Sequence, residues 1–230
     1  MELERVGLRN GSYPLDWIIS GSFKSVITMI ENHFEGFIDK NNLFQEFDIN
    51  PSYYYNKACN VHFYHDFSPY KSLDCQYDYF AKKYSRRIDR FYETVKHPTI
   101  FIRYCMNLED LEYIKINQQQ ILTLLKTFNS QNEIIYIAHT GKHFDIENIY
   151  YVEKDVGDGV ARTFLKKLPE LREHLTACSI LTYNIGCNLK RYRKKKIKKV
   201  FRKLLTKFTA FLHLKPYYHY QQYEELKNYE

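Results

Sequence analysis

The 230-residue sequence has no run of about 18 consecutive apolar residues, so no segment is predicted to cross a membrane as a helix. It has only 8 glycines and no glycine-rich phosphate loop of the dinucleotide or mononucleotide type. The motifs His-Glu-x-x-His and Gly-x-Ser-x-Gly are also missing. These absences argue against a nucleotide-dependent enzyme, a zinc protease and an α/β-hydrolase, and we predict no cofactor.

The cysteines are few and scattered. There are five, an odd number without a Cys-x-x-Cys pair, and neither a disulfide framework nor a zinc site has supporting spacing: Cys59, Cys75, Cys105, Cys178 and Cys187. The N-terminus reads Met-Glu-Leu-Glu-Arg and lacks the apolar stretch of a signal peptide. We therefore expect a cytoplasmic protein that binds no metal and uses most of its thiols as small core residues.

The charge is divided unevenly along the chain. Residues 1–188 contain 21 Lys+Arg and 24 Asp+Glu, a net charge of −3, whereas residues 189–230 contain 13 and 3, a net charge of +10. The basic character thus belongs to the C-terminal end. An asymmetry of this kind indicates an anionic surface as the partner of that end.

Apolar periodicity alternates between strand-like and helix-like segments from residue 61 onward. Helical spacing is clearest over 73–95, where Leu73, Tyr77, Phe80, Tyr84 and Ile88 recur at three or four residues. The expected helices are 23–33, 73–95, 108–128 and one from Asp158, and the expected strands are 61–64, 99–104, 134–138 and 149–152. The pattern predicts an α/β fold with a mostly parallel sheet flanked by helices over 1–176, a linker at 177–188 and a helical tail at 189–230.

Several polar residues follow or end the expected strands. His65 and Asp66 follow strand 61–64, Arg103 lies near the end of strand 99–104, and His139 follows strand 134–138. If these strands are parallel neighbours, the side chains meet at one rim of the sheet, where ligands bind in such folds. Two imidazoles, a carboxylate and a guanidinium suit proton transfer beside an anionic group.

Each of these residues also has a structural interpretation. His65-Asp66 can be turn chemistry, Arg103 a structural ion pair and His139 a surface loop residue. On helix 73–95 the basic residues form a solvated polar face, and Arg87 is the exception because it borders the apolar stripe beside Ile88 and can reach inward.

Four ordered segments resemble a largely bacterial family of domains of unknown function, described as putative papain-like cysteine peptidases. They are Ser12–Ile19, Val61–Phe67, Lys83–Phe91 and Ile100–Arg103, and the resemblance covers residues 1–175. It implies a cysteine nucleophile with His65 as its histidine and Asp66 or Asp16 as the orienting carboxylate. The family's opening strand and its cysteine precede the segment that begins here at Met1, so we expect this chain to lack the nucleophile.

The tail has an amphipathic pattern. Apolar residues keep helical spacing from Ile197 to Leu212, and the other face is basic, with Lys194, Lys195, Lys198, Lys199, Arg202 and Lys203. The pattern is typical of a helix in an anionic membrane interface. The second interpretation is that this helix docks onto the acidic body of the protein, residues 1–188. Nucleic-acid binding ranks third, because no recognised module is present.

These observations favour a cytoplasmic member of the resembled family, without its nucleophile, that is held at the inner face of a membrane by its tail. The alternative is a non-catalytic scaffold whose Arg87, Arg103 and His139 bind a peptide or a small anion. A role in surface-polysaccharide assembly comes only from the resemblance.

Overall fold

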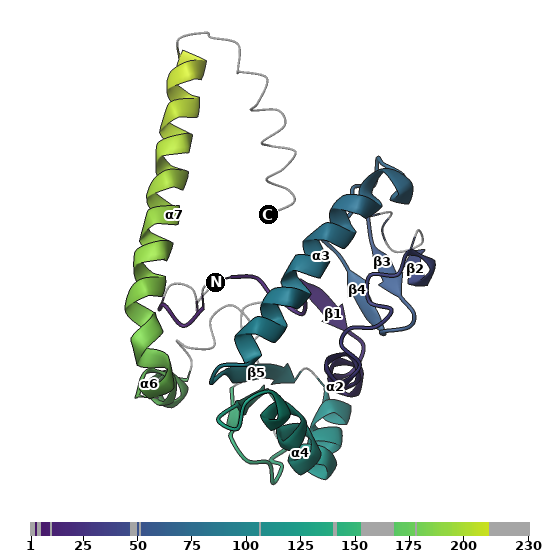
Figure 1. Ribbon diagram of the computed structural model, residues 1–230, viewed down its shortest axis with the longest axis vertical. Helices are drawn as coiled ribbons and strands as arrows, with labels where there is room; N and C mark the ends of the chain where they lie inside the picture. Colours follow the sequence, from purple (N-terminus) through teal and green to yellow (C-terminus); the bar gives the residue numbers. More distant parts are fainter. Residues whose placement is uncertain are drawn as a thin grey trace. The chain divides into compact units, whose positions relative to one another are not determined.

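The computed structural model describes most of the chain in two units (Figure 1). The α/β unit comprises residues 12–172, and the helical unit comprises residues 1–11 together with 173–230. The described residues are 3, 6–9, 11–46, 50, 52–105, 107–139, 142–152, 168–177 and 179–211, without the side chains of 176–187 and 205–211. The helix expected from Asp158 lies largely outside these residues.

Sheet A is antiparallel and has four strands of three residues each, in the order β1-β4-β3-β2: β1 (Ile18–Ser20), β2 (Leu43–Gln45), β3 (Tyr54–Asn56) and β4 (Val61–Phe63). The register places Ile18 opposite Phe63. Val61 and Phe63 are buried and His62 between them is half-buried, which is the alternation of a sheet with one covered face. Gly21 follows β1 where a Cβ atom would lie 2.3 Å from the side chain of Asn60, so this close approach requires glycine.

Sheet B is parallel and has three strands in the order β5-β6-β7: β5 (Ile100–Cys105), β6 (Glu133–Ala138) and β7 (Ile149–Tyr151). These are three of the four expected strands, and their parallel pairing confirms that part of the predicted fold. The fourth, β4, belongs to sheet A, so the prediction of one mostly parallel sheet was wrong for it. The α/β unit is a mixed fold with one sheet of each kind.

Three helices cover the sheets: α2 (Phe23–Glu31), α3 (Leu73–Val95) and α4 (Leu108–Phe128). Ser22 caps α2 by accepting a hydrogen bond from the backbone N–H of Ser25. Asn107 caps α4 by accepting one from the N–H of Asp110. A short 3₁₀ helix, η1 (Lys40–Asn42), leads into β2.

An aromatic cluster joins sheet A to α3, which runs across one face of the sheet (Figure 1). Phe63 of β4 meets Phe80 and Tyr84 of α3 with ring centroids 5.0 and 5.3 Å apart, and Phe37 meets Tyr84 at 5.4 Å. All four side chains are almost completely buried. Edge-to-face packing of such rings stabilises the core beyond the burial of their area.

The helical unit contains α7 (Ser179–Phe211), and α6 (Pro169–Ala177) precedes it in the chain. The side-chain amide of Asn188 in α7 donates a 2.9 Å hydrogen bond to the carbonyl of Gly7, which joins the N-terminal segment to α7. The helix starts at Ser179, within the stretch expected to be a linker, and includes the basic tail as far as Phe211. No helix in the described part of the chain combines the length and the apolarity needed to cross a bilayer.

Candidate functional sites

One end of sheet A brings together the chain segments that contain three predicted site residues, Asp16, His65 and Asp66. Because β1 and β4 are antiparallel and Ile18 pairs with Phe63, the residues before β1 lie beside those after β4. Trp17 and His65 make an edge-to-face contact there, with ring centroids 6.5 Å apart. His65 is exposed, so its imidazole is accessible to a ligand. We call this region the His65 end of sheet A.

The two predicted orienting carboxylates have partners other than His65. Asp66 is buried; its Oδ1 accepts a 2.6 Å hydrogen bond from Lys83 Nζ, and its Oδ2 accepts a 2.9 Å bond from the Tyr84 hydroxyl. Asp16 Oδ2 accepts a hydrogen bond from the backbone N–H of Tyr13. No hydrogen bond joins His65 to either carboxylate among the residues that the structure describes.

The side of α3 that faces Asp66 contains buried cations. Lys83 and Arg87 are buried one turn apart, whereas Lys82 and Arg86 are exposed, as expected for a solvated face. The Arg87 guanidinium lies over the Tyr84 ring, 4.9 Å from its centroid. Its Nη1 atom is buried and has no hydrogen-bond partner in the described part of the chain.

Tyr84 is held in its neutral form. Burial, and then the charge of Asp66, raise the pKa of the Tyr84 phenol well above its ordinary value, while the Arg87 charge acts in the opposite direction. A neutral phenol can donate the hydrogen bond to Asp66 that the structure shows.

Lys83 was missed by the sequence prediction, although a signal was present. Gln76, Phe80, Lys83 and Arg87 are spaced by four, three and four residues, which places them on one face of the helix, and all four are buried. The sequence pattern nevertheless predicts a solvated face for the basic residues of this helix, with Arg87 as the single exception.

Arg103 lies in β5 of sheet B, whereas His65 follows β4 of sheet A, and Arg103 forms an ion pair. Its Nη2 donates a 2.6 Å hydrogen bond to Asp110 Oδ2, and its Nη1 donates one of 3.1 Å to the hydroxyl of Ser20. Asp110 Oδ1 also accepts from the backbone N–H of Phe23 at 2.7 Å. This arrangement connects β5, α4, β1 and α2, and the ion pair is the one that the structural interpretation of Arg103 predicts.

His139 follows β6 and contacts Tyr104 of the neighbouring strand. The Tyr104 hydroxyl and His139 Nδ1 are 2.8 Å apart, and the two rings are stacked. The predicted common rim needed His65, Arg103 and His139 at the ends of strands in one parallel sheet. Because β4 belongs to the antiparallel sheet A, that condition is not met, and the rim prediction was wrong.

Of the three cysteines that the structure describes, two are buried. Cys59 and Cys105 are buried, as expected, and burial raises the pKa of Cys59 to about 11 and that of Cys105 to about 12. Cys75 is exposed in the first turn of α3, where its sulfur accepts a hydrogen bond from the Ser72 hydroxyl. No group of three or more His, Cys, Asp or Glu side chains in the described ranges is arranged to hold a metal ion.

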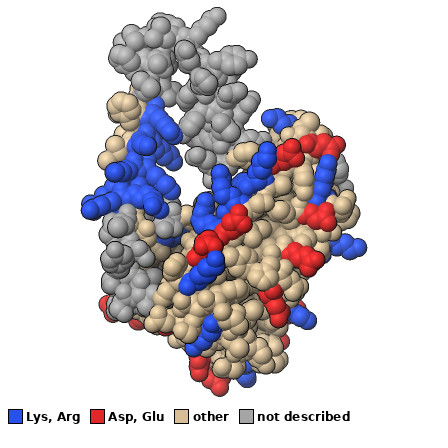
Figure 2. Space-filling model, viewed as in Figure 1, with Lys and Arg blue, Asp and Glu red and all other residues tan. Residues whose placement is uncertain are grey.

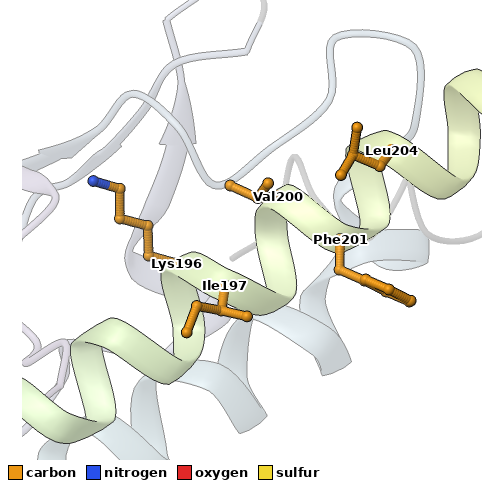
Figure 3. A pocket seen from close by; sticks show the side chains of 5 residues that line it. All are labelled: Lys196, Ile197, Val200, Phe201 and Leu204. Carbon is orange, nitrogen blue, oxygen red and sulfur yellow. The ribbon is translucent and has the colours of Figure 1, made fainter.

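A second candidate site is the exposed face of α7. Ile197, Val200, Phe201 and Leu204 line an open hollow together with the stem of Lys196 (Figure 3). The four apolar side chains are between 50% and 67% exposed. Figure 2 shows Lys and Arg side chains gathered over this helix. The predicted basic residues on it, all exposed, are Lys194, Lys195, Lys198, Lys199, Arg202 and Lys203.

The fold and these sites define a mixed α/β domain with an accessible histidine at the end of an antiparallel sheet, followed by a basic amphipathic helix. The chain belongs to the family described as "Putative papain-like cysteine peptidase (DUF1796)", whose model matches residues 1–142. This confirms the resemblance found in the sequence.

A curated relative is "Uncharacterized protein R408" from Acanthamoeba polyphaga mimivirus. It is 29% identical over 109 residues, which cover 40% of this chain and 49% of that protein. The chain thus spans about half the length of this relative. No solved structure matches the chain.

Proposed function

We propose that the protein works at the surface of an anionic membrane and that α7 attaches it there. The observation that supports this function is the exposed apolar stripe of Ile197, Val200, Phe201 and Leu204, which we call the α7 stripe. Its members are spaced by three, one and three residues and occupy one side of two helical turns (Figure 3).

The chemistry of α7 matches an interfacial helix. Burying the α7 stripe in the acyl region gains roughly 25 cal/mol per Å² of apolar surface. Each lysine or arginine near an anionic surface adds about 1 kcal/mol. Apolar burial and charge therefore act together, and binding requires both anionic lipid and the stripe.

The other two interpretations of the tail, nucleic-acid binding and docking onto the α/β unit, require different groups on α7. Nucleic acid is bound through phosphate contacts, which need the basic residues but not an exposed Phe201 or Leu204. Docking of α7 onto the acidic body needs no lipid. Dependence on both lipid charge and the α7 stripe therefore separates the membrane from these alternatives.

The test is co-sedimentation of the full chain with vesicles of phosphatidylcholine, with and without phosphatidylglycerol. We expect sedimentation only with the anionic vesicles, and its loss in Ile197→Asp/Phe201→Asp and in Lys198→Gln/Lys199→Gln/Lys203→Gln. Ile116→Asp is the matched control, because Ile116 is an exposed apolar residue on another helix, α4. Equal binding to neutral vesicles, or full binding by the α7 stripe variant, would contradict the proposal.

A second candidate function concerns the His65 end of sheet A. The exposed imidazole beside Trp17, together with the family description, supports hydrolysis or group transfer through a thiol, with His65 as the proton acceptor. The observation that favours it is the accessibility of His65.

The second candidate is tested with a thiol-directed electrophile. We expect peptide mass spectrometry of the protein purified from its native cell to find a cysteine other than Cys59, Cys75 and Cys105 that reacts near neutral pH, and His65→Ala to slow that reaction. His97→Ala, which removes another exposed imidazole, should leave the rate unchanged. Equal rates in all three proteins would exclude a thiol–imidazole pair at His65.

A further inference from the structure

The buried cluster beneath the His65 end of sheet A has one positive charge too many. Lys83 and Arg87 supply two cations and Asp66 supplies one carboxylate, and all three residues are buried. We infer that this cluster binds an oxyanion, a phosphate or carboxylate group of a ligand, through the guanidinium of Arg87. The site is separate from the α7 stripe and does not depend on membrane binding.

Arg87 forms no ion pair with Asp66, whose carboxylate is bound by two other groups. Both oxygens of Asp66 are engaged, one by Lys83 Nζ at 2.6 Å and the other by the Tyr84 hydroxyl at 2.9 Å. The stacking of Arg87 on the Tyr84 ring offsets part of the loss of water around the guanidinium. It does not satisfy Nη1, which is buried and without a partner in the described residues.

A buried cation without a carboxylate is costly unless something else neutralises it. Arg87 is only 6% exposed, and no described acidic side chain forms an ion pair with it. Arg103 provides the contrast within the same unit, because its charge is balanced by Asp110 at 2.6 Å. Arg103 therefore has a structural explanation, whereas the spare charge at Arg87 indicates a missing anion.

The chemistry of arginine selects the class of ligand. A guanidinium presents a planar fork of N–H donors that matches the oxygens of a carboxylate or a phosphate. The ligand would approach from the His65 end of sheet A, because the exposed His65 immediately precedes Asp66. Lys83 lies one helical turn from Arg87 and adds to the positive potential there.

The experiment is thermal unfolding of the full chain in increasing sodium phosphate, sodium acetate or sodium chloride at matched ionic strength. A bound anion raises the unfolding temperature along a saturating curve, whereas a general salt effect does not saturate. We expect saturation with phosphate or acetate and none with chloride. The anion whose effect on the unfolding temperature saturates at the lower concentration indicates whether the ligand carries a phosphate or a carboxylate group.

Three variants locate the anion effect. Arg87→Gln should lose the saturating component, and Arg86→Gln, its exposed neighbour on the same helix, should keep it. Arg87→Lys preserves the charge without the planar fork and should bind roughly tenfold more weakly, a comparison that remains available if Arg87→Gln does not fold. Absence of saturation in the wild type, or the same curve for Arg87→Lys and the wild type, would overturn the inference.

Discussion

The carboxylate of Asp110 accepts a 2.6 Å hydrogen bond from Arg103 and a 2.7 Å hydrogen bond from the backbone N–H of Phe23. One side chain in the first turn of α4 thereby joins the end of β5 to the start of α2. Because Arg103 also contacts Ser20 of β1, this ion pair links sheet B to sheet A.

Replacing Asp110 should therefore destabilise the whole α/β unit. Asp110→Ala leaves the Arg103 charge without its partner and the first N–H of α2 without its acceptor. We expect a loss of about 3–5 kcal/mol in the free energy of unfolding, measured by urea denaturation. Glu109→Ala, an exposed neighbour, should change it by less than about 0.5 kcal/mol. Similar losses for both variants would contradict a central role for the pair.

The excess positive charge around Arg87 predicts an order of stability among variants. Asp66→Ala leaves two buried cations without a counter-charge and should cost about 3 kcal/mol or more of unfolding free energy. Lys83→Met removes one of those cations and should cost less, and Lys82→Met on the exposed face should cost almost nothing. Chemical denaturation of the three variants gives this order, and a larger loss for Lys83→Met than for Asp66→Ala would show that the charges are balanced differently.

Thiol accessibility should separate the described cysteines. Cys75 is exposed, whereas Cys59 and Cys105 are buried with raised pKa values. Brief treatment with iodoacetamide at neutral pH should modify Cys75 and spare the other two until the protein is unfolded. Peptide mass spectrometry measures the three positions separately, and early modification of Cys105 would contradict the burial seen here.

Stability should decline at alkaline pH, partly because of Cys105. Its pKa is raised from the ordinary value of 9.0 to about 12 in the folded protein, chiefly by burial. Above pH 9 the unfolded chain loses the thiol proton while the folded protein keeps it. Unfolding therefore becomes more favourable, and the free energy of unfolding falls as the pH rises from 9 towards 12. The slope for one such proton is about 1.4 kcal/mol per pH unit. Cys105→Ala should reduce the slope of unfolding free energy against pH by about that amount.

The parts of the fold that the sequence predicts are those with long, regular patterns. The 23 residues of α3 show their apolar period through Phe80, Tyr84 and Phe91, and the observed helix has the predicted bounds. The strands of sheet B are runs rich in β-branched and aromatic residues between turns, and β6 is buried along Ile134–Ala138. Such patterns are local, so a single chain shows them without knowledge of its neighbours.

Sheet A could not be predicted in the same way. Its strands are only three residues long, and of the four only β4 shows a strand-like pattern, the one that predicts strand 61–64. Tyr54–Asn56 lies in a segment without such a pattern. Whether β4 pairs with β1 or with a distant parallel strand depends on contacts between remote residues. That choice decides whether His65 lies beside Trp17 or beside Arg103, so the site geometry required the structure.

The sequence pattern also does not predict the burial of Lys83. It lies at the edge of the apolar stripe, where a long side chain can either remain in water or turn inward to meet a carboxylate. Asp66 is 17 residues away in the sequence, and nothing in the pattern pairs it with Lys83.

The most direct test of the central claim, that α7 attaches the protein to an anionic membrane, uses a single fluorescent reporter. The sequence has one tryptophan, Trp17, so Trp17→Phe/Phe201→Trp places the only indole on the α7 stripe, and Trp17→Phe/Lys199→Trp places it among the basic residues. Addition of vesicles containing phosphatidylglycerol should shift the emission of the first protein to the blue and leave that of the second nearly unchanged. No shift at position 201, or an equal shift at both positions, would contradict insertion of the α7 stripe.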